Sequence, residues 1–361
     1  MLSAHTAALS MSLYLAQSRT VTKMVKILII APNWIGDAVM TEPLISQLKK
    51  NNPNSQIDVL ATPWVASIMK AIPAVNQIIT ADFQHGSLQW KERKALAKQL
   101  ALSDYTHAYV LPNSFKSALI PWLAKIPHRI GYQGEMRWGL INAAHKNPSR
   151  SHRPPMSSHY FALSGIPCSE VPEPHLSLPD AMITDSQQAL QKIQAHQDLY
   201  VLCPGAEYGS AKQWPIEHFG QLAKNIIETK ESSLVLILGS KKEFSIGSDI
   251  ARMSSHPDKV INWCGQTSLE DAMAAISNAT AVISNDSGLM HIAAAFRRPQ
   301  VAIFGSSDPR HTPPLSKLAA IHWLHLECSP CFKRTCPLGH LKCLVDIEVK
   351  DVLNSVNQLT H

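Results

Sequence analysis

The 361-residue sequence predicts an α/β protein of two parallel-sheet domains that face each other across a cleft. Short apolar runs of strand length, such as Val25–Ala31 and residues 234–238, alternate with amphipathic helical patterns. This alternation is typical of parallel sheets that helices cover on both faces. The pattern occurs twice, once on each side of a proline-rich stretch, and the chain length suits two domains rather than one.

The first domain is expected at residues 24–165. Its first strand, Val25–Ala31, is followed by a loop at 32–36 and by an amphipathic helix that extends to Lys50. Further strands are predicted at 57–61, 77–80 and 108–111, and helices at 65–71 and 92–102. Residues 1–23 are uncharged before Arg19, and polar residues interrupt their apolar ones, so we interpret them as a poorly ordered leader rather than a signal peptide.

A linker at residues 166–182 is expected to separate the domains, because residues 147–180 hold seven prolines and show little periodicity. A short helix near 157–164 interrupts this stretch. The second domain is expected at residues 183–345. Its strands are predicted at 199–203, 234–238, 281–284 and 300–304, and its helices at 185–197, from 215 onward, at 268–277 and at 288–295. Residues 346–361 form a final helix that is a candidate for crossing back to the first domain.

Charge is distributed unevenly along the chain. Residues 26–160 carry a net charge of +8, whereas residues 161–361 carry −4. The stretch 112–153 alone holds seven basic residues and one acid, Glu135. The first domain should therefore attract an anionic partner, such as a phosphorylated glycolipid or an anionic membrane surface, unless the stretch is only a solvated basic face. No aromatic-basic RNA-binding motif accompanies it, so nucleic acid is not expected as a partner.

The first motif, APNWIGDAVMTEPL at residues 31–44, joins a strand to a helix through Gly36. Glycine lets the backbone approach a ligand closely. Asp37 follows at the predicted mouth of the cleft, where it is a candidate catalytic carboxylate. An aspartate before a helix is also a good N-cap, and both interpretations stay open. The motif is not the GxGxxG of dinucleotide-binding enzymes.

The second and third motifs belong to the second domain. CPGAEYGSAKQWP at 203–215 presents a small-residue loop and Lys212 after a strand, an arrangement that can bind phosphate, although an ordinary loop with a surface lysine would have the same sequence. SNDSGLMHIAAAF at 284–296 places Asp286 between a strand and a helix, with His291 one turn into that helix. The helix N-terminus can meet a pyrophosphate, while Asp286 can also be only a cap and His291 only structural.

Four of the seven cysteines form a C-terminal cluster with His340, spaced C-x2-C-x4-C-x3-H-x2-C from Cys328 to Cys343. Such a cluster can bind zinc, form disulfides or pack as small apolar groups, and we favour packing. A bound zinc ion would be structural, since the cluster lies far in sequence from Asp37 and Lys212. Without an export signal we expect a reducing, cytoplasmic compartment, which disfavours disulfides.

Taken together, the three motifs resemble glycosyltransferase family 9, the heptosyltransferases of lipopolysaccharide core assembly. The similarity covers about residues 25–350. NWIGDAVM, LPNSFKSAL at 111–119 and the cysteine cluster point within the family to the member that adds the second heptose. The resemblance implies a GT-B fold with two Rossmann-like domains. It also implies an inverting enzyme with no cofactor and no catalytic metal, consistent with the absence of a DxD motif beside the donor loop.

The implied reaction moves L-glycero-D-manno-heptose from ADP-heptose to the first heptose of heptosyl-Kdo2-lipid A. Asp37 would be the general base and Lys212 would neutralise the leaving diphosphate. The implied donor-binding residues are Glu207, Tyr208, Ser210, Lys212, Asp286, Ser287, Gly288 and His291. Adenosine is expected against residues 262–270 and the loop after Leu238.

The acceptor would bind to the first domain. We predict that it meets Asn33, Trp34, Asn113, Ser114, Lys116, Arg129 and Arg137. The enzyme is expected to be peripheral at the inner face of the cytoplasmic membrane. The alternatives are a transferase with the same donor and another core acceptor, and a non-catalytic protein that binds nucleotide sugar or nucleic acid.

Overall fold

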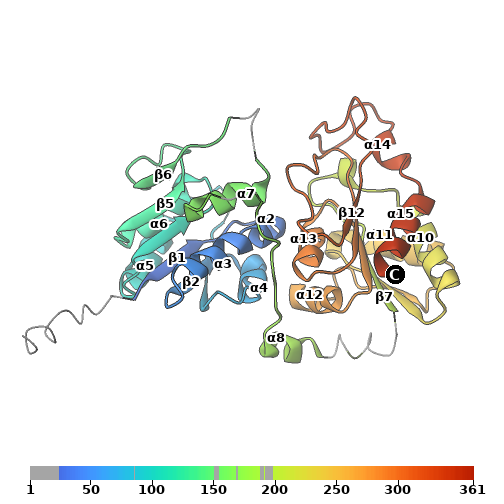
Figure 1. The fold of residues 1–361 in the computed structure, drawn as a ribbon, viewed down its shortest axis with the longest axis horizontal. Helices are drawn as coiled ribbons and strands as arrows, with labels where there is room; N and C mark the ends of the chain where they lie inside the picture. Colours follow the sequence, from blue (N-terminus) through green and yellow to red (C-terminus); the bar gives the residue numbers. More distant parts are fainter. Residues whose placement is uncertain (1–23, 85, 150–153, 168–169, 188–190, 192–197) are drawn as a thin grey trace, which may run out of the picture.

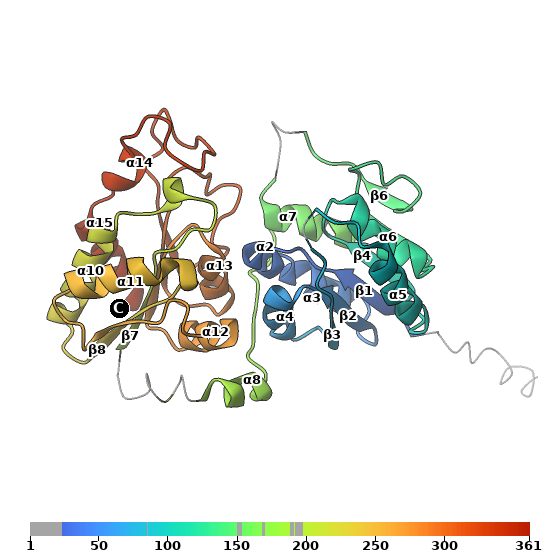
Figure 2. The same cartoon turned by 180° about the vertical axis from the view of Figure 1, so that it is seen from behind.

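A computed structural model describes residues 24–84, 86–149, 154–167, 170–187, 191 and 198–361. Two lobes lie side by side, each built from a sheet between helices (Figure 1). Figure 2 shows the same division from behind, with the segment around α8 (Asp180–Asp185) below the junction of the lobes. The leader predicted at 1–23 lies outside the described residues.

In the described part of the chain, the first lobe holds a six-stranded parallel sheet in the order β3-β2-β1-β4-β5-β6. β1 (Lys26–Ile30) pairs with β2 (Gln56–Ala61) and β4 (His107–Val110). The sheet is completed by β3 (Gln77–Thr80), β5 (His128–Tyr132) and β6 (Ala143–His145). The strand order reverses between β1 and β4, the position at which open parallel sheets bind ligands. β5 and β6 were not predicted, because polar and small residues interrupt their apolar pattern.

The helix predicted from Gly36 to Lys50 is two helices, α2 (Ile35–Met40) and α3 (Glu42–Asn51). Pro43 explains the break, because proline has no amide hydrogen to continue the helical ladder and its ring crowds the preceding turn. Thr41 stabilises the junction by donating its hydroxyl to the Ala38 carbonyl at 2.7 Å. The other helical segments of this lobe are α4 (Pro63–Lys70), α5 (Trp90–Ala101), α6 (Phe115–Leu123), α7 (Met156–Phe161) and η2 (Ala162–Ser164).

The second lobe repeats the architecture, and its described strands form a six-stranded parallel sheet in the order β12-β11-β10-β7-β8-β9. The strands are β7 (Asp198–Cys203), β8 (Ser233–Ile237), β9 (Val260–Asn262), β10 (Ala281–Asn285), β11 (Gln300–Ile303) and β12 (Ala319–His322). The helical segments are η3 (Ser210–Lys212), α10 (Ile216–Thr229), η4 (Lys241–Glu243), α11 (Phe244–Met253), α12 (Leu269–Ser277), α13 (Gly288–Ala295), α14 (Lys342–Val345) and α15 (Val349–Thr360). The helix predicted at 185–197 lies mostly outside the described residues.

The final helix, α15, does not cross back to the first lobe as suggested. It packs on α10 and on the β10–β12 side of the second sheet. Val352 and Val356 are fully buried in the hydrophobic core of that lobe. The apolar face of the helix is therefore buried within the second lobe and is not available to pack on the first lobe.

The two lobes are joined by packing as well as by the chain. α2 packs against α13 and α4 against α12, so that one hydrophobic core continues from one lobe to the other. The segment before α8 runs between the lobes, where the amide of Ser177 donates to Ala71 at 2.9 Å and the amide of Leu176 donates to Ala295 at 3.1 Å. Within the described residues, no helix is both long and apolar enough to cross a lipid bilayer.

Candidate active site

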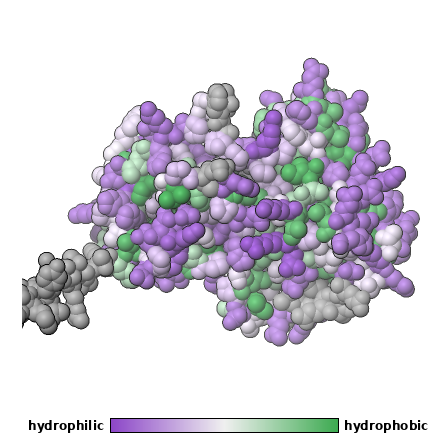
Figure 3. All heavy atoms as spheres, in the orientation of Figure 1, coloured by the Kyte–Doolittle hydropathy of each residue, from purple (hydrophilic) through white to green (hydrophobic). Residues whose placement is uncertain are grey.

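The carboxyl ends of both parallel sheets lead into the loops that carry the sequence motifs. β1 leads to residues 31–36 and α2, β7 leads to 204–213, and β10 leads to 286–288 and α13. The surface dips between the two lobes at the top of the view (Figure 3), the side toward which the loop after β7 extends in Figure 1. Ligands of parallel-sheet proteins bind at this end of the strands.

Two glycines allow α2 and α13 to meet at the junction. A Cβ on Gly36 would lie 2.8 Å from Cδ2 of His291, and a Cβ on Gly288 would lie 2.8 Å from Cγ2 of Ile35. Real carbon atoms do not approach this closely without a shift of one partner. Glycine at these positions therefore brings the first and third motifs together across the lobes.

Asp37 is the third residue of α2 and does not cap it, since the N-cap position belongs to Trp34. Among the described residues, its carboxylate has no hydrogen-bond or ion-pair partner. Burial raises the pKa of Asp37 to about 6. The buried phenol of Tyr160, on α7, is close enough for the Asp37 charge to contribute to its raised pKa, after the larger effect of burial. An unpaired carboxylate with a pKa near neutrality has the properties of a general base.

Lys212 and Asp286 form an ion pair at the facing edge of the second lobe. The Lys212 Nζ lies 2.5 Å from Asp286 Oδ2, and the hydroxyl of Ser307 donates to the same oxygen at 2.5 Å. The side chains are 18% and 6% exposed, so the pair is largely shielded from water. Asp286 is thus a partner of Lys212 and not a helix cap, because Ser287 occupies the N-cap position of α13.

Asn285 fixes the loop that carries Lys212. Its side-chain oxygen accepts from the amide of Trp214 at 3.0 Å, and its side-chain nitrogen donates to the Pro204 carbonyl at 2.7 Å. Both ends of the 204–213 loop are therefore tied to the end of β10. Sequence reasoning missed Asn285 and Ser307, although each stands at the carboxyl end of a predicted strand, the signal that would have identified them.

His291 is buried and packs on Gly36. Burial lowers the pKa of His291 to about 4, an effect that Asp286 opposes and Lys212 reinforces. The imidazole is therefore neutral near neutral pH, when it can donate or accept a hydrogen bond but carries no charge.

The remaining donor-side candidates line the 207–210 loop and the start of α13. Tyr208 is partly exposed, with Lys212 Nζ 5.2 Å and the Arg334 guanidinium carbon 5.4 Å from its ring centroid. Glu207 is on the surface and pairs with Lys242 at 2.7 Å. Ser210 begins η3, Ser287 lies 3.1 Å from Ser284 through their hydroxyls, and Gly288 is the first residue of α13.

The segments expected to meet adenosine lie side by side at the ends of β8 and β9. The amide of Gly265 donates to Gly239 at 2.9 Å. Glu243, a residue that sequence reasoning missed, is buried beside Gly205 and Gly239 and accepts from the amide of Ser240 at 2.8 Å. The S-x-x-E spacing of this capping box was the available signal.

On the acceptor side, two of the predicted segments are at the carboxyl edge of the first sheet. Asn33 and Trp34 are exposed just before α2, and the Trp64 indole donates to the Asn33 carbonyl at 2.7 Å. Ser114 caps α6 by accepting from the Ser117 amide at 3.2 Å. Lys116 follows in the first turn of α6 and is partly exposed.

Arg129 and Arg137, which were predicted to contact the acceptor, donate hydrogen bonds to backbone carbonyls of the protein. Arg129 donates to the backbone carbonyls of Leu140 and Ile126, each at 2.6 Å. Arg137 is 2% exposed and donates to the Tyr132 carbonyl, to the Pro112 carbonyl at 2.6 Å and to the Asn113 side chain at 2.9 Å. The Arg137 guanidinium is buried and satisfies carbonyls around it, so it is not available to acceptor phosphates. Arg129 is only partly buried, so its contact with the acceptor stays a prediction.

Comparison with known proteins identifies the family. Glycosyltransferase family 9 (heptosyltransferase) matches residues 93–342. The chain is 38% identical to lipopolysaccharide heptosyltransferase 2 of Salmonella typhimurium, with 92% of this chain and 98% of that protein covered. It is 39% identical to lipooligosaccharide heptosyltransferase 2 of Haemophilus ducreyi, with 92% and 99% covered.

The solved structures agree. The structure of E. coli ADP-heptose lps heptosyltransferase II superposes with a TM-score of 0.80 at 35% identity, covering 93% of this chain and 98% of that one. The predicted GT-B fold, an α/β fold of two facing domains, is therefore confirmed. The chain belongs to glycosyltransferase family 9, the heptosyltransferases.

Proposed function

We propose that the chain transfers L-glycero-D-manno-heptose from ADP-heptose to the first heptose of heptosyl-Kdo2-lipid A, with inversion at the anomeric carbon. The relatives at 37–39% identity that are named heptosyltransferase 2 support this substrate pair. The relative named as a different core heptosyltransferase, OpsX of Haemophilus influenzae, is only 23% identical, which does not favour the alternative acceptor.

The observation that carries the proposal is the placement of unlike charges on the two sides of the α2–α13 contact. Asp37 supplies an unpaired carboxylate from one lobe, and Lys212 supplies a cation from the other. His291 links the two sides, since it packs on Gly36 and its pKa responds to both Asp286 and Lys212. Inversion by a single displacement needs a base on one side of the anomeric carbon and stabilisation of the leaving group on the other.

In the proposed step, Asp37 accepts the proton of the acceptor hydroxyl as its oxygen bonds to the anomeric carbon. The bond from that carbon to the diphosphate oxygen breaks, and ADP leaves with both electrons. Lys212 and the N-terminus of α13 stabilise the negative charge that develops on the diphosphate. Asp286 and Ser307 hold Lys212 in position, while Asp286, Ser287, Gly288 and His291 are the proposed contacts of the donor sugar and phosphates.

Donor turnover tests this function directly. Purified enzyme should release ADP from ADP-heptose when heptosyl-Kdo2-lipid A is present, and much more slowly when it is absent. Release that is equally fast without acceptor would indicate a hydrolase, and no release under either condition would support a binding protein.

The same proposal needs no metal in the transfer step, because Lys212 and a helix N-terminus supply the positive charge that a divalent cation would otherwise supply. Brief addition of EDTA to the assay should leave the rate unchanged. Loss of the rate with EDTA and its recovery with Mg²⁺ would contradict the mechanism.

We also propose that the enzyme works in the cytoplasm, peripheral to the inner leaflet of the membrane. Three apolar side chains are 38–79% exposed: Phe115 at the start of α6, and Met136 and Trp138 in the loop after β5. The Phe115 amide joins the two segments by donating to Glu135 at 2.9 Å. Lys116 and Lys125 add positive charge on the same helix and its end. Exposed aromatic side chains with lysines are typical of membrane-interface contacts.

Vesicle sedimentation can test the peripheral contact. The protein should sediment with vesicles that contain anionic lipid, and not with purely zwitterionic vesicles. Trp138→Ser should reduce that binding, whereas Leu102→Ser, an exposed apolar residue at the end of α5, should not. Equal binding by all three proteins would place the membrane contact elsewhere.

A further inference from the structure

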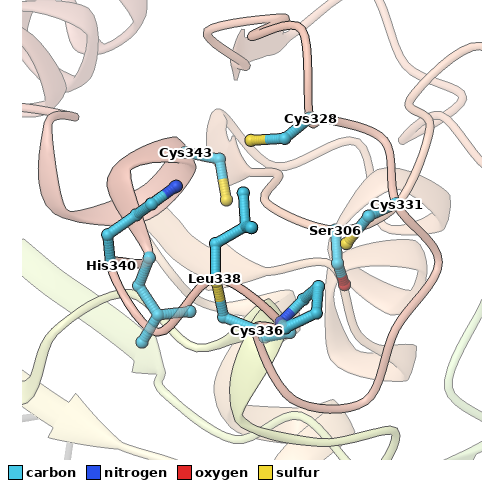
Figure 4. A pocket seen from close by; sticks show the side chains of 10 residues that line it. Ser306, Cys328, Cys331, Cys336, Leu338, His340 and Cys343 are labelled. Atoms are coloured by element: carbon cyan, nitrogen blue, oxygen red, sulfur yellow. The ribbon is translucent and has the colours of Figure 1, made fainter.

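The C-terminal cysteine cluster gathers around one pocket of the second lobe. Cys328, Cys331, Cys336, Cys343 and His340 all line it (Figure 4). Cys343 is on α14, and the loop that carries the other four, residues 323–341, contains no helix or strand. Loops of this length without internal secondary structure usually need a specific constraint to hold one conformation.

Packing of the thiols as small apolar groups, the interpretation we favoured from the sequence, does not supply that constraint. Only Cys343 is buried, and the other three cysteines are partly exposed. Phe332 and Leu338 in the same loop are 57% and 61% exposed, so they contribute little to a core. All six cysteines within the described residues are free thiols.

Two polar features of the pocket suit a cation with thiolate ligands. Ser306 lines the pocket, is 1% exposed, and its hydroxyl is a buried polar atom without a hydrogen-bond partner among the described residues. Backbone amides of residues 338–341 lie within hydrogen-bonding reach of the Cys336 sulfur. Amides directed at a cysteine sulfur favour the thiolate, which is the form that binds metals.

The cysteine cluster is also hydrogen-bonded to the loop at residues 204–213, the donor loop, which carries Lys212. The Ala211 amide donates to Arg334 at 3.0 Å, and the Phe332 amide donates to Ser306 at 2.7 Å. Ser306 in turn donates its amide to Ala211 at 3.1 Å. Ala211 precedes Lys212 and Ser306 precedes Ser307, so the cysteine loop supports both residues that contact Asp286.

We propose that Cys328, Cys331, Cys336 and Cys343 bind one thiophilic divalent cation, with Zn²⁺ the best match to four thiolates. The ion would be structural, holding the cysteine loop against the donor loop. As the side chains stand, no group of three or more Cys, His, Asp or Glu residues in the described chain is placed to hold a metal ion. Binding of the ion therefore requires that the four sulfurs move inward around the pocket that they line.

The residues around the pocket fit this ligand set. Zinc with four thiolates carries a net charge of −2, and Lys333, Arg334 and Lys342 lie within the same loop or directly after it. The Nδ1 of His340 accepts from the Lys342 amide at 3.0 Å, which occupies that nitrogen and favours four sulfur ligands over a histidine substitute.

Metal analysis of the full chain, purified under reducing conditions without a histidine tag, tests the proposal. We expect about one zinc ion per chain. Cys328→Ser with Cys331→Ser should lower that content at least about tenfold, because two of four ligands are lost. Cys264→Ala, which removes a buried thiol outside the loop, should leave the content unchanged.

A second measurement remains informative if the double variant fails to fold. Wild-type protein stripped with a strong thiol-competing chelator and titrated with Co²⁺ should develop thiolate-to-cobalt absorption at one equivalent. It should then melt at a higher temperature than the stripped protein, and its KM for the donor should fall. Stripped protein that binds no Co²⁺, native protein without metal, or full metal content in the folded double variant would each overturn the proposal.

Discussion

The two sides of the cleft differ in whether the carboxylate that they carry has a partner. Asp286 in the second lobe is paired with Lys212 and hydrogen-bonded to Ser307, so its charge is compensated by the protein. Asp37 in the first lobe has no such partner among the described residues, and burial raises its pKa to about 6. A compensated carboxylate positions other groups, whereas an uncompensated one keeps its affinity for a proton. We therefore propose that Asp37 transfers the proton, whereas Asp286 positions Lys212 beside the donor.

Asp37→Asn should have the largest effect, because it removes the base and keeps the shape. The kcat should fall about 10²–10⁴-fold, while the donor dissociation constant changes little. Steady-state kinetics and donor titration separate these quantities. Glu92→Gln, an exposed acid in the first turn of α5, is the matched control and should keep full activity. An Asp37→Asn enzyme within about threefold of wild type would remove Asp37 from its proposed role.

Lys212→Ala should have the next largest effect. The substitution removes the cation from the leaving-group side and leaves Asp286 without its partner, so kcat should fall about 10²–10³-fold and the donor KM should rise. Lys224→Ala is the matched control, because it removes an exposed lysine whose ion pair with Glu228 spans 3.8 Å. It should leave kcat and the donor KM unchanged. Loss of kcat with an unchanged donor KM would show that Lys212 does not contact the bound donor.

Arg137→Ala and Lys116→Ala should separate structure from acceptor binding within the basic stretch. Arg137→Ala leaves buried carbonyls unpaired, at a cost of about 1–3 kcal/mol, and should lower the melting temperature. Lys116→Ala should raise the acceptor KM about fivefold with little change in melting temperature. If both variants shifted only the acceptor KM, the structural assignment of Arg137 would be wrong.

The smallest expected effect is on stability. The folded state raises the pKa of Asp37 from 3.8 to about 6, so it binds the proton more tightly than the unfolded chain does. Below about pH 4, Asp37 is protonated in both states and does not lower the free energy of unfolding. As the pH rises from about 4 to about 6, the group ionises more readily in the unfolded chain, and the free energy of unfolding falls. The melting temperature of Asp37→Asn minus that of wild type should therefore be a few degrees larger at pH 8 than at pH 5, given about 2–4 °C per kcal/mol. A difference of the opposite sign would show that the ionised carboxylate is stabilised by the fold.

Much of this arrangement follows from sequence patterns. Apolar strands of five or six residues followed by glycine-containing loops place Asp37, Lys212 and Asp286 at the carboxyl ends of parallel strands, because the chain direction of each strand is fixed by its connecting helix. The helix predicted at 288–295 is found at those residues for the same reason. Pro43 was the visible signal for the break between α2 and α3, and it was overlooked.

Partners contributed by distant loops could not be predicted. The charge of Arg137 suggested an anionic ligand, but its buried carbonyl partners come from residues 112 and 132, which only the fold brings together. Ser307 reaches Asp286 across 21 positions of sequence, and His291 reaches Gly36 from the other lobe. Composition and periodicity carry no information about such contacts, because they depend on how strand ends align in two different sheets.

The pH dependence of kcat/KM tests the central contrast most directly, since it reports the groups that titrate in the free enzyme. With both substrates well below saturation, the wild type should lose activity toward acid with an apparent pKa of about 6, the value of Asp37. The fall should be about tenfold per pH unit below that value, and the residual activity of Asp37→Asn should lack this limb. A wild-type profile that is flat from about pH 8 to about pH 5, or an acidic limb that persists in Asp37→Asn, would contradict the assignment of proton transfer to the unpaired side of the cleft.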